Sequence, residues 1–125
     1  MKVKDLLAKL KGKSLKGFDV FVFFCDTEGA RVTNCFDIRG HVKFPNGQFA
    51  FITDAFERND KTVISLETFV GYLRVMDGDA LVKITSDIYD MDDLHEVLEV
   101  YYDKLSKLLI LSTKHIETSS LGQKL

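Results

Sequence analysis

The strongest local constraint on how this chain folds is the pair Asn46-Gly47, which separates two alternating apolar runs. Residues 41–44 and residues 48–52 each have the composition and apolar alternation of a half-buried strand. Asn-Gly between two such runs readily forms a tight hairpin turn. The pattern therefore predicts an antiparallel hairpin over residues 41–52.

The segments around this hairpin predict further strands. Residues 18–25 (FDVFVFFC) are dense in β-branched and aromatic side chains, which is typical of a central strand buried on both faces. Polar turn sequences at residues 26–29 and 57–60 would reverse the chain on either side of the hairpin, and residues 62–66 are another strand candidate. Successive reversals of this kind predict an antiparallel meander.

Residues 65–76 fit two different structures. Four apolar side chains have helical spacing behind Ser65, a candidate N-cap, whereas residues 68–72 have the composition of a strand. We favour the strand, in which residues 72–76 and 80–84 pair as a last hairpin across an Asp-Gly-Asp turn.

Helical periodicity is present at both ends of the chain. Residues 3–11 have apolar side chains at i, i+3, i+4 and i+7, which predicts a short basic helix that ends at Gly12. A longer helix is predicted from about residue 91 to residue 114, with Asp90 as its N-cap. Together the segments predict an α+β fold: an antiparallel meander sheet of about five to six strands with a short N-terminal helix and a longer C-terminal helix.

The predicted C-terminal helix has more apolar positions than a single stripe needs, including Val100 and residues 108–111. A second apolar face needs a second partner surface, so we expect a homo-oligomer that assembles through this helix. We expect one domain over residues 1–117 and a mobile, polar tail over residues 118–125.

Composition narrows the class of protein. The chain has 125 residues, of which 46% are hydrophobic and 29% charged, values typical of one globular domain. No apolar run approaches the roughly 18 residues of a membrane span, residues 1–15 lack a signal-peptide core, and two cysteines are too few for a disulfide framework. We therefore expect a cytoplasmic protein with no membrane partner.

The formal net charge of −2 is the sum of two opposite segments. Six lysines and one aspartate give residues 1–16 a charge of +5, whereas nine acids and one lysine give residues 77–103 a charge of −8. The low total argues against direct binding of duplex nucleic acid. The acidic segment suggests a helix that contacts a basic partner protein, although separately solvated faces would explain the same pattern. The candidate contact residues are Asp92, Asp93, Glu96 and Glu99.

Catalytic and metal-binding patterns are absent from the sequence. The three histidines, His41, His95 and His115, are dispersed, and neither Gly-x-Ser-x-Gly nor a glycine-rich phosphate loop occurs. We expect no catalytic residue, no metal site and no cofactor, and therefore a protein that is not an enzyme.

Arginine, asparagine and phenylalanine side chains gather at or beside the predicted turns. Arginine forms bidentate hydrogen bonds with phosphate and aromatic rings stack on planar bases, although turns also recruit such residues as solvated side chains. The candidate ligand-binding residues are Arg31, Asn34, Arg39, Phe56, Arg58 and Asn59.

In general style this Lys- and Phe-rich chain with a short basic first helix is similar to many small phage and mobile-element proteins. We expect a small, oligomeric, non-enzymatic protein that binds a phosphorylated or nucleotide-like ligand, as a sequestering or anti-defence protein would. The alternative hypothesis is a protein–protein inhibitor that presents an acidic helix to a basic, nucleic-acid-binding partner.

Overall fold

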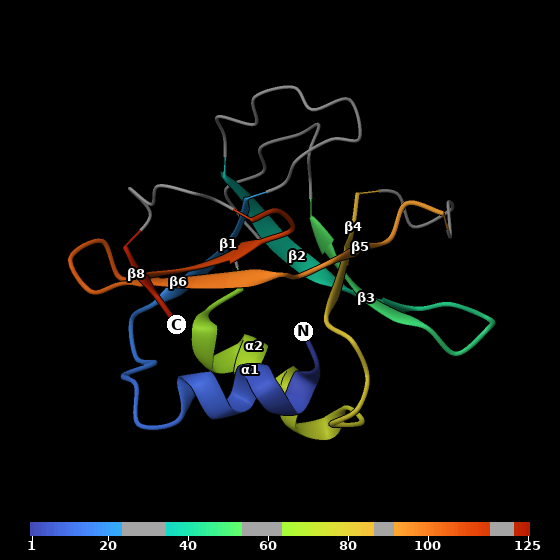
Figure 1. Ribbon diagram of the computed structural model, residues 1–125, viewed down its shortest axis with the longest axis horizontal. Coiled ribbons are helices and arrows are strands. Elements are labelled where there is room, and N and C mark those ends of the chain that lie inside the picture. The colour runs from blue at the N-terminus through green and yellow to red at the C-terminus, as the bar shows by residue number, and fades with distance from the viewer. Residues whose placement is uncertain (24–34, 54–63, 87–91, 116–121) are drawn as a thin grey trace.

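The computed structural model describes residues 1–23, 35–53, 64–86, 92–115 and 122–125, and of residues 35–37 and 39 it describes the backbone alone. Two helices and eight strands occur in these ranges (Figure 1). In chain order they are α1 (Val3–Leu10), β1 (Asp19–Phe23), β2 (Cys35–Lys43), β3 (Phe49–Thr53), α2 (Leu66–Val75), β4 (Lys83–Thr85), β5 (His95–Glu96), β6 (Glu99–Asp103), β7 (Leu108–Ser112) and β8 (Gln123–Lys124).

The strands hydrogen-bond in the order β5-β4-β3-β2-β1-β7-β6-β8. This order divides into two four-stranded halves, β5-β4-β3-β2 and β1-β7-β6-β8, which meet where β2 pairs with β1. The register of β2 against β3 shifts between Ile38 and Gly40, an irregularity that bends a strand. Each half is mixed, because β3 pairs with β4, and β1 with β7, in parallel. The prediction of a single antiparallel meander of five to six strands is therefore wrong.

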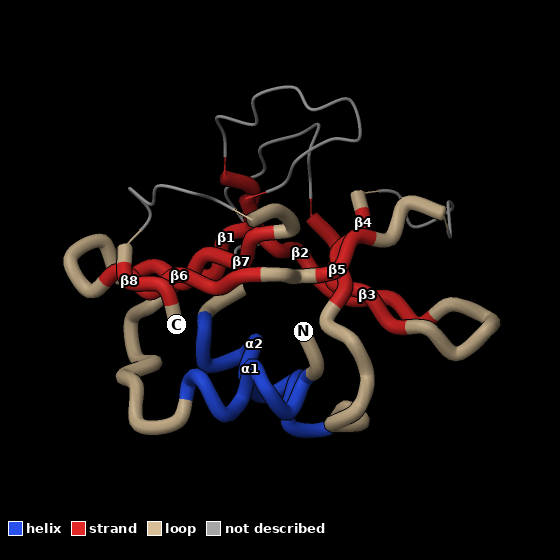
Figure 2. Tube along the Cα trace, viewed as in Figure 1, coloured by secondary structure: helices blue, strands red, loops and turns tan. Residues whose placement is uncertain are grey.

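Both helices lie on the same side of the strands (Figures 1 and 2). Their buried side chains and the strand residues that face them form one apolar cluster, in which Leu6, Phe69, Val20, Leu109 and Val100 are fully buried. Because a helix and a sheet each have an apolar face to bury, this two-layer packing satisfies both.

Two local predictions are confirmed. The N-terminal helix is α1, and Gly12, at φ +80°, follows its end. The hairpin between β2 and β3 turns through Gly47, at φ +87°, and the Phe44 N–H donates to the Gln48 carbonyl at 2.8 Å. These two features depend on neighbouring residues alone, which is why a sequence pattern identifies them.

The hairpin predicted from residues 72–76 is wrong, because α2 occupies this region. Of the strand predicted over residues 62–66, Ser65 forms an isolated bridge with Asp19, and Leu66 begins α2. Residues 62 and 63 lie outside the described ranges. Ser65 is the N-cap: its side chain accepts a hydrogen bond from the Thr68 N–H at 3.2 Å. The helical spacing places Leu66, Phe69, Val70 and Leu73 on the buried face, so burial of that face outweighs the strand propensity of the segment.

The N-cap gives a stability prediction. Replacing Ser65 with alanine is expected to lower the free energy of unfolding by about 1 kcal/mol, because the Thr68 N–H loses its acceptor. Replacing Ser65 with aspartate keeps an acceptor and should retain most of the stability. Urea denaturation of the three proteins measures both effects; equal losses in the two variants would contradict a capping role.

The long C-terminal helix is also wrong, since β5, β6 and β7 occupy that region. Residues alternate along β6: Val100 and Tyr102 belong to the apolar cluster beneath the helices, whereas Glu99 and Tyr101 do not. β6 and β7 are joined by a turn in which the Asp103 carboxylate accepts from the Leu105 N–H at 3.0 Å. The predicted homo-oligomer was to assemble through this helix, so the argument for that interface no longer applies.

The expected tail lies partly outside the described residues. Within residues 122–125, β8 pairs with β6, and the Leu125 N–H donates to the Val100 carbonyl at 2.9 Å. The division of the chain at residue 117 stays a prediction.

Candidate functional site

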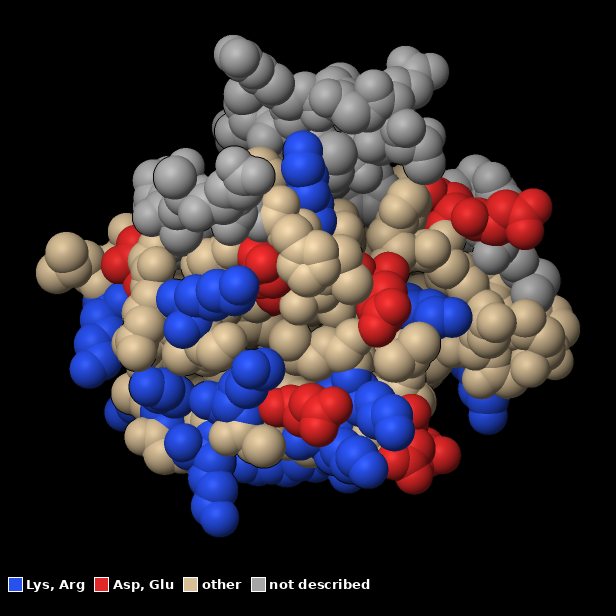
Figure 3. Space-filling model, in the orientation of Figure 1, with Lys and Arg blue, Asp and Glu red and all other residues tan. Residues whose placement is uncertain are grey.

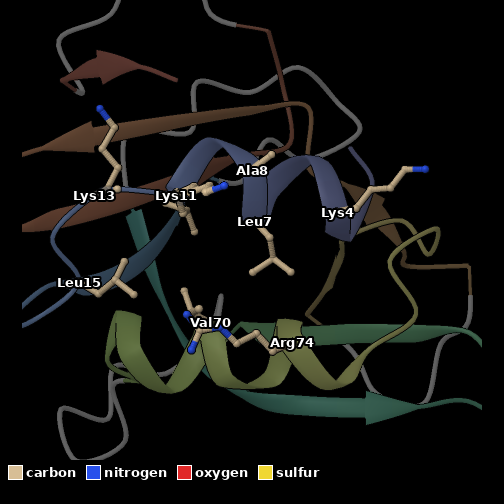
Figure 4. Close-up of a pocket in the computed structure, with 10 residues that line it drawn as sticks. Lys4, Leu7, Ala8, Lys11, Lys13, Leu15, Val70 and Arg74 are labelled. Atoms are coloured by element: carbon tan, nitrogen blue, oxygen red, sulfur yellow. The ribbon is translucent and has the colours of Figure 1, made fainter.

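A groove of about 550 Å³ lies between α1 and α2. Its aliphatic lining includes Leu7, Leu10, Leu15 and Val70, and Figure 4 shows Leu7 extending from α1 toward α2. Its basic lining consists of Lys4, Lys11, Lys13 and Arg74. We call this feature the interhelical groove.

The four cations of the interhelical groove differ in their partners. Lys4 forms an ion pair of 2.8 Å with Asp79, and this hydrogen bond raises the pKa of Lys4 and lowers that of Asp79. Lys13 lies over the Tyr102 ring, 5.6 Å from its centroid. Lys11 and Arg74 are exposed and form no ion pair with any residue in the described ranges. Lysine and arginine side chains gather over the helical layer in Figure 3.

A second cavity, of about 500 Å³, lies between the β2–β3 hairpin and the end of α2. Three rings line it: His41 stacks on Phe49 with centroids 5.1 Å apart, and meets Tyr72 edge to face at 4.5 Å. Phe49 contacts the buried Phe51, which contacts Phe69 on α2 at 4.7 Å. The rings therefore continue from the surface into the core, which fixes the shape of this aromatic pocket.

A smaller hollow of about 330 Å³ adjoins the aromatic pocket and shares Gly47, Phe49 and Ala80 with it. Asn46 and Lys83 also line this hairpin hollow, and Lys43 lines the aromatic pocket. The Asn46 side chain accepts a hydrogen bond from the Gln48 N–H at 3.0 Å, which orders the turn. Rings, two lysines, a carboxamide and the carboxylate of Asp77 thus line adjoining concave surfaces.

At least three of the four carboxylates of the predicted acidic surface form contacts within the chain, and the first two are Asp93 and Glu96. Burial alone would raise the pKa of Asp93, but hydrogen bonds from Ser86 and from His95 outweigh it and lower that pKa. Asp93 accepts from the Ser86 hydroxyl at 2.7 Å and lies 2.8 Å from His95 Nε2. Glu96 pairs with the N-terminal ammonium group of Met1.

Glu99 is the most buried of the four predicted carboxylates, with 4% of its surface exposed. It accepts a hydrogen bond from the Tyr101 hydroxyl, pairs with Lys124 Nζ at 3.0 Å, and lies 2.9 Å from His115 Nδ1. Burial and the neighbouring carboxylate raise the pKa of Tyr101 to about 12. Asp92, the remaining member, is exposed. β5 and β6 lie where the acidic helix was predicted, so these residues do not form a helical surface. Their partner-binding role stays a prediction.

The structure describes the side chains of none of the six predicted ligand-binding residues. Arg31, Asn34, Phe56, Arg58 and Asn59 lie outside the described residues, and Arg39 is described by its backbone in β2 alone. Their role stays a prediction.

The sequence analysis did not predict the aromatic pocket, although it predicted the hairpin on which His41, Lys43 and Phe49 lie. In the β2–β3 register His41 pairs with Phe51 and Lys43 with Phe49, so these four side chains belong to one face of the two strands. Tyr72 joins them only because residues 66–75 form a helix. The pocket could therefore be predicted only if residues 66–75 were assigned as a helix.

Comparisons with protein-family models, with curated proteins and with solved structures found no match to this chain. Neither described helix has the length and apolar run needed to cross a membrane. Among the described residues, no group of three or more metal-ligating side chains comes together.

Proposed function

We propose that the protein binds and sequesters a small phosphorylated, nucleotide-like ligand and does not convert it. The observation that supports this proposal best is the aromatic pocket with Lys43 at its lining, joined to a hairpin hollow that contains Lys83 and Asn46. The planar part of the ligand would contact the rings and its phosphate the lysines. A sequestering role of this kind would suit an anti-defence protein.

The chemistry of the linings supports this class of ligand. Stacking on an aromatic side chain stabilises a bound base by about 1–3 kcal/mol and tolerates any base, because every base has a π face. Lysine interacts with phosphate as a point charge. The pocket volume, about 500 Å³, lies within the range of about 300–1,000 Å³ that small-molecule sites occupy.

The surface rings of the pocket rest on rings of the core. His41 is exposed and Phe49 is half-buried, while Phe51 and Phe69 beneath them are fully buried. A surface ring supported by core rings loses little further freedom on binding, so more of the stacking energy remains as affinity. Arg31, Arg39 and Arg58 stay candidates for additional phosphate contacts.

The proposal predicts nucleotide binding that depends on Tyr72. We expect adenosine and guanosine mono- and triphosphates to raise the melting temperature, since they stabilise only the folded state. Replacing Tyr72 with leucine removes a ring from the pocket and should weaken binding about tenfold, as measured by isothermal titration calorimetry.

Two controls separate the site from general effects. Replacing Lys83 with alanine should weaken the binding of the phosphorylated ligands and leave the binding of the free nucleosides unchanged. Lys104→Ala, in the exposed β6–β7 turn, should change neither affinity. No stabilisation by any nucleotide, or equal binding by wild type and the Tyr72→Leu variant, would refute the proposed site.

A further inference from the structure

We infer that the interhelical groove is a docking surface for an acidic amphipathic helix of a partner protein. The inference concerns a different face of the molecule from the aromatic pocket and does not depend on nucleotide binding. It follows from three properties of the groove: its aliphatic floor, its basic rim, and the separation of its cations.

The aliphatic floor matches the apolar stripe of a helix. Val70 and Leu10 are almost fully buried, and Leu7 and Leu15 are half-buried, so apolar surface remains exposed along the groove. Ala8, on the α1 wall, is too small to obstruct an approaching helix. Helix-in-groove recognition uses apolar anchors at i, i+3, i+4 and i+7, which lie along such a floor.

The rim determines the charge of the occupant. All four charged side chains that line the groove in the described structure are basic. Lys11 follows directly after α1 and Arg74 lies on α2, so cations border the groove on both sides. An occupant with carboxylates flanking its apolar stripe would pair with both sides, whereas a basic helix would be repelled.

The separation of the cations favours a helix over a small anion. Figure 4 shows Lys4 and Lys13 at opposite ends of the groove. Lys4 and Lys11 alone are about 10 Å apart along the helix axis, at 1.5 Å per residue. Acidic residues on successive turns of a helix, about 5.4 Å apart, match cations distributed along the groove better than a single phosphate or carboxylate does.

The shape also favours a helix over a lipid surface. The strongly apolar face of α1, with Val3, Leu6 and Leu10, is buried in the core and is not free to enter a bilayer. The remaining apolar surface is concave, which a flat membrane would not fill. Helices, in contrast, pack at about 8–10 Å between axes with ridges in grooves.

The test uses a designed peptide as the probe. A capped, fluorescein-labelled peptide of about 15 residues would have leucines at i, i+3, i+4 and i+7, glutamates beside this stripe and alanines elsewhere, so that it can form a helix. A scrambled peptide of the same composition would lack the stripe. We expect the striped peptide to bind about tenfold more tightly in fluorescence anisotropy. The affinity of the striped peptide should fall at about 0.5 M salt, because salt screens its ion pairs with the groove.

Matched variants identify the surface. The double variant Lys11→Glu/Arg74→Glu changes two exposed groove residues and should weaken the striped peptide about tenfold or more. Lys104→Glu/Lys114→Glu makes the same change in net charge outside the groove and should bind like wild type. Circular dichroism confirms that each variant is folded.

Several outcomes would overturn the inference. They are equal binding of the striped and scrambled peptides, unchanged binding in the Lys11→Glu/Arg74→Glu variant, and binding of dodecyl phosphate or of anionic phosphatidylglycerol vesicles in place of the peptide. Nucleotide binding should be the same in Lys11→Glu/Arg74→Glu as in wild type, so failure here is distinguishable from failure of the aromatic pocket.

Discussion

Replacing Phe69 with alanine is expected to lower the free energy of unfolding by about 3–5 kcal/mol. The side chain is fully buried, and its ring centroid lies 4.7 Å from that of Phe51 on β3. Truncation loses the transfer free energy of the ring and leaves a cavity between α2 and the sheet, which a close-packed core refills only in part.

Urea denaturation at neutral pH measures this loss. Val75→Ala is the matched control on the same helix, because Val75 is 85% exposed and its truncation should change the free energy of unfolding by less than about 0.5 kcal/mol. A loss below about 1 kcal/mol for Phe69→Ala would mean that α2 does not pack on β3 as the structure has it.

The same substitution connects the core to the proposed site. Phe51 meets Phe69 below and Phe49 above, with Phe49 and Phe51 centroids 5.5 Å apart at 80°. Phe49 in turn lines the aromatic pocket. We therefore expect the Phe69→Ala protein, at temperatures where it is folded, to bind nucleotides more weakly than wild type although residue 69 does not line the pocket.

Local chemistry explains which parts of the fold were predictable. The Asn46-Gly47 turn and the amphipathic spacing of α1 depend on residues close in sequence, and both predictions are confirmed. α2 has the same kind of signal, with Ser65 as an N-cap. Its β-branched and aromatic residues pointed to a strand because composition does not reveal that their helical face is buried against β3.

The C-terminal half was mispredicted for a different reason. In a segment this rich in leucine, residues at helical spacing occur by chance, and Leu105, within the helix predicted over residues 91–114, is 97% exposed. The decisive feature is the parallel pairing of β1 with β7, in which Val20 aligns with Leu109. Contacts between residues so distant in sequence leave no local pattern, and they convert a helical expectation into strands.

The sequence indicated the charge of the candidate surface but not the arrangement of its side chains. The basic N-terminal segment indicated a positively charged surface, and the structure shows that Lys4, Lys11 and Lys13 border one groove with Arg74 from α2. The arrangement of the aromatic pocket depended on α2 being a helix, which the strand preference concealed. Once Tyr72 is placed on α2, its approach to His41 follows from the packing.

Replacing Tyr101 with phenylalanine is expected to lower the free energy of unfolding at neutral pH by about 1–3 kcal/mol. Tyr101 is fully buried, and its hydroxyl donates to Glu99, which is itself 4% exposed. The substitution removes this donor from a buried carboxylate that retains Lys124 and His115 as partners. A partly satisfied carboxylate in a buried position is less favourable than the complete network.

The effect of this substitution on the free energy of unfolding should become smaller at alkaline pH. The pKa of Tyr101 is about 12 in the folded protein, against 10.0 for an unperturbed tyrosine. Above pH 10 the unfolded chain releases the Tyr101 proton while the folded chain still holds it, so wild type loses stability as the pH rises toward 12. Phenylalanine has no such proton, so the difference between the two proteins narrows across this interval.

Urea denaturation of both proteins at pH 7, 9 and 11 measures the narrowing, because the other titrating groups are common to both and cancel in the difference. Tyr72→Phe is the matched control, since Tyr72 lies on α2 outside the Glu99 network. A Tyr101→Phe difference that stays constant from pH 9 to pH 11 would show that Glu99 does not hold the Tyr101 proton. In that case the network with His115 and Lys124 would depend on the ion pairs alone, and Glu99→Gln should then cost as much as Tyr101→Phe or more.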